Sequence, residues 1–293
     1  MGSHSLYRRR VPARIRARGI TGRTLTYFVL IAGAIILMMP FVFMVSTAFI
    51  PYSYALSLPP TIIPLHPTLQ NFVDAWNGTS SVGFGRALLN STIVSVTSTA
   101  LCVMLSAMLG FAFARYSFPG KTIFYYFILL TFMLPNMVLI IPQFVLAEHL
   151  HLINSLQGLI IIYCAGMALN VFLLRGFFED IPRDLQDAAD IDGAGIWRMF
   201  WNIMLPLARP ALATVTILTF MGIWTEFAYA LTFLNDPSLY TLPVALSYFQ
   251  EANLTDYGIM FAGTIIATAP MIIVFLLLQR HFVKGISAGA VKA

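Results

Sequence analysis

The sequence predicts an all-α integral membrane protein with six transmembrane helices and both termini in the cytoplasm. Composition is the first reason: 59% of the 293 residues are hydrophobic, 10% are charged, and the mean hydropathy is +0.82. Soluble domains carry about a quarter of charged residues. The second reason is that six segments hold the ~20 mainly apolar residues that a membrane-crossing helix needs. The third is the one-sided distribution of lysine and arginine.

The six predicted spans divide the chain into a membrane domain with two tails. In order, the spans are Leu25–Phe49, Ala87–Ala114, Thr122–Leu146, Ser155–Phe178, Arg209–Leu234 and Tyr257–Val283. The domain therefore covers residues 25–283, with a basic tail at 1–24 and a short tail at 284–293. Its two long connections are residues 50–86 and residues 179–208.

The first span is expected to stay in the mature protein. It is too long for a cleaved signal peptide, and no small-residue cleavage site follows it. The arginine-rich residues before it predict a disordered tail held near anionic lipid headgroups. Nucleic-acid binding is not expected, because the orientation of the chain accounts for these arginines.

Lysine and arginine fix that orientation. A cytoplasmic N-terminus places every Lys and Arg except Arg86 on the cytoplasmic side, as the positive-inside rule requires. Loop 50–86 is then exterior and loop 179–208 cytoplasmic. The exterior loop holds no long regular element, because proline fixes φ and removes a donor; its prolines are Pro51, Pro59, Pro60, Pro64 and Pro67.

Three of the predicted spans contain polar side chains that suggest a structural or functional role. Small hydroxylated residues in the second span favour close helix contact within the bilayer; they are Ser91, Thr92, Ser95, Thr97, Ser98 and Thr99. In the third span, Asn136 follows Pro135 near an expected helix break. In the fifth span, Glu226 is the one acid within any predicted span, which makes it a candidate functional group.

The cytoplasmic loop contains a short predicted helix. Pro182 suits its first turn, and Asp184 and Asp187 favour its positive end. Leu185, Ala188 and Ala189 share one narrow face, which lets another protein's backbone come close. Gly193 and Gly195 end the helix.

The rest of this loop returns the chain to the membrane. Trp197, Phe200 and Ile203 repeat at three-residue spacing and can lie on the membrane surface, and Leu205-Pro206 leads towards the fifth span. From these residues alone, a solvated amphipathic helix beside the membrane is as good an interpretation as a docking element.

The sequence contains no clear catalytic or metal-binding constellation. Gly120-Lys121-Thr122 lacks the glycine that a phosphate-binding loop needs five residues earlier, where this chain has Arg115. Glu148–His151 lacks metalloprotease spacing, and Cys102 and Cys164 lie inside apolar runs. We therefore expect no metal or cofactor on this chain, and any ATP that drives it must be hydrolysed by another subunit.

Several motifs resemble those of ABC-importer permeases for carbohydrates. Asp187-Ala188-Ala189, Asp192-Gly193-Ala194 and Leu205-Pro206 occur in the order of the family's "EAA" loop, with Asp187 in place of Glu. The resemblance covers roughly residues 25 to 292. It includes Arg115–Lys121, Phe172–Phe178, Trp224–Phe227, Asp236–Pro243 and the tail Gly285–Lys292. The nearest type is the smaller, six-span permease of the maltose-type heterodimer.

This resemblance implies a fold, partners and contact residues. The fold is that of binding-protein-dependent (type I) importers, in the bacterial or archaeal plasma membrane. The partners are a second permease, two ATPase subunits that hold ATP and Mg²⁺, and an extracytoplasmic solute-binding protein. The loop over 187–206 couples to the ATPase subunits through Asp187, Ala188, Ala189, Asp192, Gly193, Ala194, Leu205 and Pro206.

The resemblance also suggests a solute path. Its candidates are Trp224, Glu226 and Tyr229 in the fifth span and Asn136 in the third. Stacking of a sugar on an aromatic ring is one use of these residues, and pairing of Glu226 with the partner permease is the alternative that we favour. A non-sugar solute such as glycerol-3-phosphate stays open. An ion-driven carrier or a membrane enzyme is less favoured, because the sequence has no clear repeat and no clustered catalytic residues.

Overall fold

The computed structural model describes residues 13–51, 64, 66–78, 83–252 and 256–290. All regular structure in these residues is helical. The helices are α1 (Ala13–Ala48), α2 (Gln70–Asn77), α3 (Phe84–Arg115), α4 (Lys121–Met133), α5 (Asn136–His149), α6 (Leu156–Ala165), α7 (Ala168–Asp180), α8 (Arg183–Ile191), α9 (Ile196–Met199), the π-helix η2 (Phe200–Met204), α10 (Leu205–Leu207), α11 (Arg209–Trp224), α12 (Ala228–Phe233), the 3₁₀-helix η3 (Pro237–Leu239), α13 (Leu242–Ala252) and α14 (Tyr257–Ala290).

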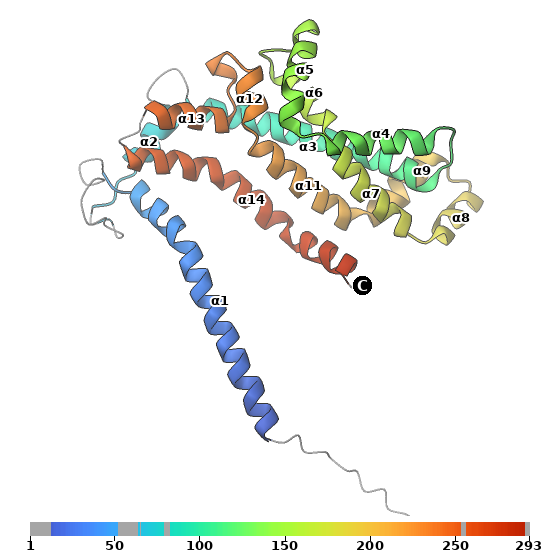
Figure 1. Ribbon diagram of the computed structural model, residues 1–293, viewed down its shortest axis with the longest axis horizontal. Helices are drawn as coiled ribbons and strands as arrows, with labels where there is room; N and C mark the ends of the chain where they lie inside the picture. Colours follow the sequence, from blue (N-terminus) through green and yellow to red (C-terminus); the bar gives the residue numbers. More distant parts are fainter. Residues whose placement is uncertain (1–12, 52–63, 65, 79–82, 253–255, 291–293) are drawn as a thin grey trace, which may run out of the picture.

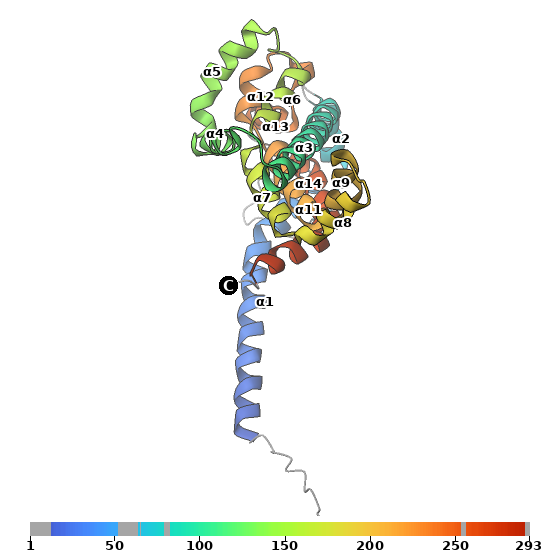
Figure 2. The same cartoon turned by 90° about the vertical axis from the view of Figure 1, so that its right-hand side faces the viewer.

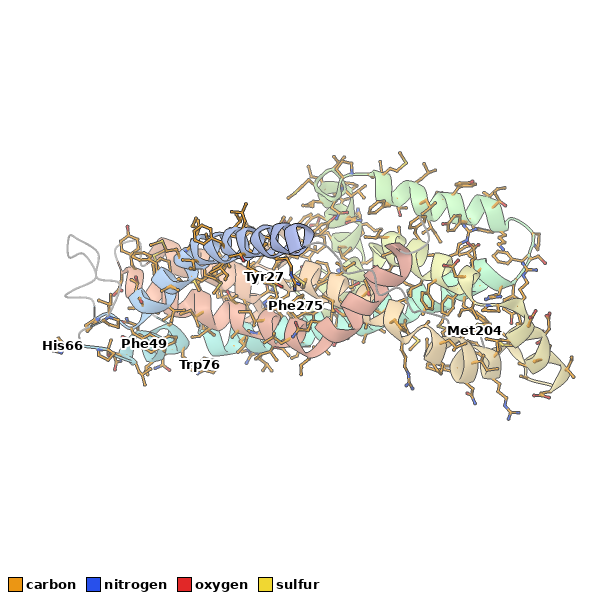
Figure 3. The ribbon with its side chains drawn as sticks, turned by 90° about the horizontal axis from the view of Figure 1, so that it is seen from below. Tyr27, Phe49, His66, Trp76, Met204 and Phe275 are labelled. Atoms are coloured by element: carbon orange, nitrogen blue, oxygen red, sulfur yellow. The ribbon has the colours of Figure 1, made fainter. Side chains whose placement is uncertain are left out.

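The helices form an elongated bundle with two distinct ends (Figure 1). Helices α2 and α13 lie at one end, and α8 and α9 lie at the other. Trp76 and Met204 mark these ends in Figure 3. Following the predicted orientation, we name them the exterior end and the cytoplasmic end.

Helix α3 is the central element of the bundle and packs against α6, α7, α11 and α13. It has 32 residues, so it is about 48 Å long at 1.5 Å per residue. Four of its six hydroxylated residues are buried as predicted, namely Ser91, Ser95, Ser98 and Thr99, whereas Thr92 and Thr97 are exposed within this chain. Gly110 lets α7 approach closely, since a Cβ there would lie 3.0 Å from the backbone nitrogen of Arg175. Small residues thus permit close packing around α3.

Three of the predicted spans are unbroken helices: Gly22–Ala48, Phe84–Arg115 and Tyr257–Leu277 each pass the length and hydropathy requirement for a membrane crossing. Three further candidates are bent pairs of helices, which gives up to six crossings. The fold is therefore an all-helical membrane bundle, as the composition predicts.

The third, fourth and fifth spans are not the continuous helices that hydropathy suggests. The third breaks at Leu134-Pro135 with a bend of 107°, because proline cannot continue the hydrogen-bond ladder. The fourth breaks at Gly166-Met167 with a bend of 49°. The fifth stops at Trp224 and restarts at Ala228, and α11 forms a bent pair of 78° with the preceding helical segment.

The two ends have separate apolar cores. The exterior core brings together buried residues from α3, α6, α12 and α13, including Phe84, Leu159, Phe233 and Leu242. The cytoplasmic core joins α3, α7 and η2 through Phe111, Phe178, Phe200 and Met204. The cytoplasmic loop is therefore packed onto the ends of the spans.

Helix α1 stands apart from the bundle along most of its length (Figures 1 and 2). None of its most apolar window is buried within the chain. Its outer end is attached: Phe43 packs edge-on against Phe261 at 6.0 Å, and the Asn71 amide donates to the carbonyls of Ala48 and Ile50, both at 2.9 Å.

Both tails are more helical than the sequence predicts. Helix α1 begins at Ala13, so residues 13–24 are helical, whereas residues 1–12 lie outside the described part of the chain. Helix α14 likewise continues to Ala290, through most of the predicted tail 284–293. In both cases the helix of the adjacent span continues into the flanking residues.

Candidate functional site

The cytoplasmic loop forms the short helix that the sequence predicts. Helix α8 begins after Pro182 and ends at Ile191. Gly193 then adopts a left-handed φ of +74°, and no atom lies within 4 Å of a Cβ built on it. The N–H of Ala194 donates to the carbonyl of Ala189 at 2.9 Å, which closes the last turn. The predicted start and end of this helix are confirmed.

Helix α8 presents a mixed acidic and apolar surface. Asp187, Ala188, Asp192 and Gly193 are exposed, and Ile191 is 86% exposed. Ala189 behaves differently from its neighbour, because it is 6% exposed and packs into the cytoplasmic core. The face expected for docking is thus divided: Ala188 points outward and Ala189 holds the helix to the chain.

The segment after α8 packs more tightly than expected. Phe200 is 1% exposed and its ring lies 5.4 Å from that of Phe111, so the predicted membrane-surface row through Trp197, Phe200 and Ile203 is wrong at its middle residue. The π-helix η2 and the packing of α3 turn that side chain inward. Further along the loop, Ala194 and Leu205 are half-buried, and Pro206 is exposed.

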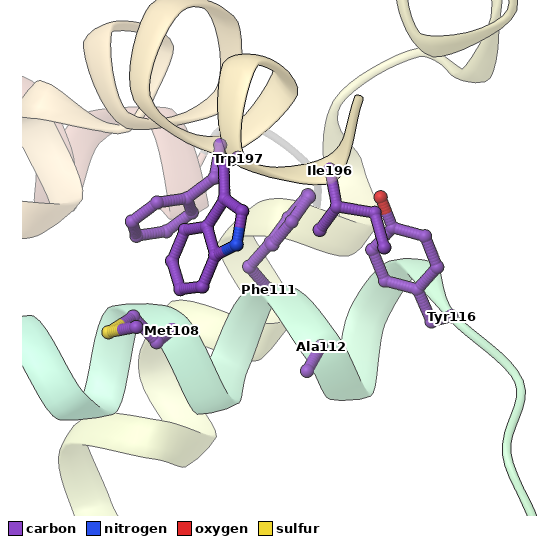
Figure 4. Close-up of a pocket in the computed structure, with 7 residues that line it drawn as sticks. Met108, Phe111, Ala112, Tyr116, Ile196 and Trp197 are labelled. Carbon is purple, nitrogen blue, oxygen red and sulfur yellow. The ribbon is translucent and has the colours of Figure 1, made fainter. Parts of the chain in front are cut away.

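A small apolar cavity lies between this segment and α3. It has a volume of about 190 Å³, and its walls are Met108, Phe111, Ala112, Tyr116, Ile196, Trp197 and Phe200. In Figure 4 the indole of Trp197 points from α9 towards α3. Because its lining is apolar, the cavity lacks the polar groups that orient a solute.

The intramembrane acid lies in the gap between α11 and α12. One oxygen of Glu226 accepts hydrogen bonds from the Tyr163 hydroxyl at 2.6 Å and from the Ala230 N–H at 3.2 Å. The other accepts from the Tyr229 N–H at 2.9 Å. The carboxylate therefore caps the first turn of α12 and joins it to α6. This cap is the physical reason that the fifth span can break at this point.

The other path candidates divide into two groups. Tyr229 is buried, and its hydroxyl donates to the backbone carbonyl of Asn136 at 3.1 Å, so the breaks of the third and fifth spans meet. Asn136 itself is exposed. Trp224 is not part of this junction between the two breaks. It is 4% exposed, stacks on Phe220, and donates its ring N–H to the Ala267 carbonyl at 3.1 Å.

Sequence reasoning missed Tyr163. This tyrosine lies in an aliphatic stretch of the fourth span, 63 residues before Glu226, and no local spacing connects the two. Among the searched residues, no group of three or more His, Cys, Asp or Glu side chains is placed to hold a metal ion. The polar site that the structure does define is the break between α11 and α12, where Glu226 accepts hydrogen bonds from other residues of the same chain.

These features define a multi-pass helical membrane protein with an exposed short helix in the loop before α11. Residues 102–288 match the family described as "Binding-protein-dependent transport system inner membrane component". The chain belongs to this family. It is thus an ABC-importer permease of the prokaryotic inner or plasma membrane, a transport subunit and not an enzyme, which sets aside the ion-driven carrier and the membrane enzyme.

Individual relatives are similar over most of the chain. The diacetylchitobiose uptake system permease protein NgcG of Streptomyces coelicolor is 32% identical over 90% of this chain and 87% of its own length. The galactooligosaccharides transport system permease protein GanQ of Bacillus subtilis is 33% identical over 91% of this chain and 94% of its own. A crystal structure of a bacterial ABC transporter involved in alginate import has the same fold, with a TM-score of 0.78 at 23% identity, covering 95% of this chain and 100% of that one.

Proposed function

We propose that the chain forms half of a solute path in an importer of di- or oligosaccharides. A second permease completes the path, two ATPase subunits supply ATP and Mg²⁺, and an exterior binding protein delivers the solute. The names of the similar permeases, which refer to diacetylchitobiose, galactooligosaccharides and trehalose, support a sugar as solute.

The observation that carries the coupling proposal is the surface of α8. Four acids on or next to this helix are exposed: Asp184, Asp187, Asp190 and Asp192. Ile191, among them, is 86% exposed. An exposed apolar side chain rimmed by charges is typical of a protein-binding surface. The ATPase subunits are the partners that this position fits.

The solute path is proposed to run along the helix breaks. Non-helical backbone at membrane depth is tolerated where it is buried in protein or lines a water-filled cavity. Asn136 and Thr225 are exposed at the two breaks, and they can meet sugar hydroxyls. Glu226 is bonded within the chain at the break of the fifth span, and Trp224 is bonded to α14, so neither is proposed to contact the solute. A carboxylate next to the path disfavours an anionic solute such as glycerol-3-phosphate.

The first experiment tests coupling by charge reversal on α8. Asp187→Lys places a cation on the docking surface, and we expect it to lower ATPase co-purification and solute-stimulated ATP hydrolysis by about tenfold, as for a charge within an interface. The matched control is Glu148→Lys, an exposed acid near the end of α5 and on the predicted exterior side, which should leave both measurements unchanged. Equal co-purification of the ATPase with Asp187→Lys and the parent chain would contradict the coupling role of α8.

The solute class is tested with the same reconstituted complex. ATP hydrolysis is measured with the binding protein and a panel of disaccharides, oligosaccharides, sugar alcohols and glycerol-3-phosphate. We expect a neutral sugar to stimulate ATP hydrolysis and glycerol-3-phosphate not to stimulate it. Stimulation by glycerol-3-phosphate and by no sugar would overturn the solute class and leave the coupling role standing.

A further inference from the structure

Arg115, the last residue of α3, is bonded to the entry of the cytoplasmic loop. Its Nη2 donates to the carbonyl of Phe178 at 2.5 Å and to the carbonyl of Ile181. These carbonyls lie at the C-terminal end of α7 and directly before Pro182, where a helix leaves backbone acceptors without intrahelical partners. One guanidinium thus caps α7 and fixes the point where the chain enters α8.

The neighbouring residues of α3 hold the same loop from other sides. The Phe111 ring lies 5.9 Å from that of Phe178 on α7 and 5.4 Å from that of Phe200 in η2. The Tyr116 ring packs edge-on against Phe111 at 5.4 Å. Burial and the charge of Asp190 on α8 raise the pKa of Tyr116. The segments before and after α8 are therefore attached to one turn of α3.

The opposite end of α3 is bonded to an exterior segment in a comparable way. The Asn90 amide, which is 3% exposed, donates to the carbonyls of Ser238 at 2.9 Å and Tyr240 at 3.1 Å. The Leu242 N–H donates to the Ser91 hydroxyl at 2.7 Å. These contacts tie residues 238–242 to the start of α3.

Between these two attachments α3 is unbroken, whereas the third and fourth spans bend at Pro135 and Gly166 and the fifth is interrupted between Trp224 and Ala228. A continuous helix moves as one body, whereas a broken span can bend at its break. Of the described elements that the loop contacts, α3 is the continuous one that also holds the exterior segment 238–242.

We propose that α3 carries movement of the cytoplasmic loop to the exterior segment 238–242, with Arg115 and Asn90 as the positioning residues at its two ends. This inference rests on the proposed function, because it needs the ATPase subunits to move the loop. Rigid helices and hydrogen-bond networks can carry such coupling between distant sites, and here α3 is the rigid element and the bonds of Arg115 and Asn90 join it to its partners at the two ends.

The test uses the complete importer with a reporter at the exterior end. Ser238→Cys, in a chain whose Cys102 and Cys164 are replaced by alanine, is labelled with an environment-sensitive fluorophore. The signal is followed after ATP, Mg²⁺ and orthovanadate are added, together with ATP hydrolysis before trapping. In Arg115→Gln and Asn90→Ala we expect the ATP-dependent signal to fall at least about threefold, within the range found for mutations along coupled networks. ATP hydrolysis per assembled complex should persist.

Controls separate transmission from simple loss of structure. Arg209→Gln removes an exposed cytoplasmic arginine at the start of α11 and should leave the signal unchanged. Arg115→Lys keeps the charge and should restore part of the signal. If Arg115→Gln does not assemble, Asn90→Ala carries the test from the other end. A full signal in either assembled variant overturns the inference. The absence of an ATP response in the unmodified complex overturns the proposed coupling itself.

Discussion

At the scale of single residues, Glu226 shows how an intramembrane charge is accommodated. Three hydrogen bonds from the same chain satisfy its carboxylate, two of them from the backbone of α12. An unpaired acid at this depth is costly. The bonds therefore make Glu226 part of the scaffold of the helix break, and the exposed Asn136 is the better candidate for solute contact.

Substitution of Glu226 tests this assignment. Glu226→Gln keeps one acceptor oxygen, which can hold either the Tyr229 N–H or the Ala230 N–H but not both, and it keeps the size of the side chain, so we expect transport near that of the parent chain. Glu226→Ala removes all three bonds and should lower the free energy of unfolding by about 1–3 kcal/mol, read as a lower Tm of the purified complex. Loss of transport in Glu226→Gln at an unchanged Tm would instead indicate direct contact between the carboxylate and the solute.

At the scale of elements, hydropathy predicted where helices lie better than where they break. Pro135 and Gly193 act through their own backbone, so the sequence predicts the break and the helix end at these positions. The breaks at Gly166 and Thr225 fall inside predicted spans and were not predicted. The second depends on Glu226 and Tyr163, which meet only when α6 and α12 pack together. The burial of Phe200 was likewise set by contacts with α3.

A pair of glycine substitutions tests the role of close packing in two helices. A Cβ at Gly158 in α6 would lie 1.9 Å from the backbone oxygen of Leu152, so Gly158→Ala must move the chain and should sharply reduce the yield of folded complex. A Cβ at Gly222 in α11 meets no atom within 4 Å, and Gly222→Ala should stabilise by up to about 1 kcal/mol through helix propensity. Size-exclusion profiles and Tm values compare the two, and equal behaviour would refute the packing argument.

At the scale of the whole molecule, the chain has a packed bundle and one outlying helix. Helix α1 joins the bundle near Phe43 and through the Asn71 amide, while its apolar window is unburied. Gly258 at the start of α14 completes this junction, because a Cβ there would lie 2.6 Å from the Asn71 amide nitrogen. The position of α1 relative to the bundle thus depends on a few contacts at the exterior end.

Asn71→Ala tests this junction. It leaves two carbonyls without their donor in a buried place, and we expect a loss of about 1–3 kcal/mol in the free energy of unfolding. It should also weaken engineered cross-links between α1 and α14. Gln70→Ala is the control: the exposed Gln70 side chain donates to Asp74 of the same helix at 2.7 Å, and its removal should change stability by less than about 0.5 kcal/mol. Unchanged cross-linking in Asn71→Ala would show that other contacts hold α1.

At Gly193, backbone conformation and side-chain size are two separate constraints. Substitution by the standard L-amino acids changes both at once. Within this chain the position restricts handedness and not size, because φ is +74° while the surrounding space is open. A D-amino acid introduced there by chemical ligation would keep the loop conformation whatever the bulk of its side chain. The largest D-side chain that the assembled importer tolerates at this position would then show how closely a neighbouring subunit approaches Gly193.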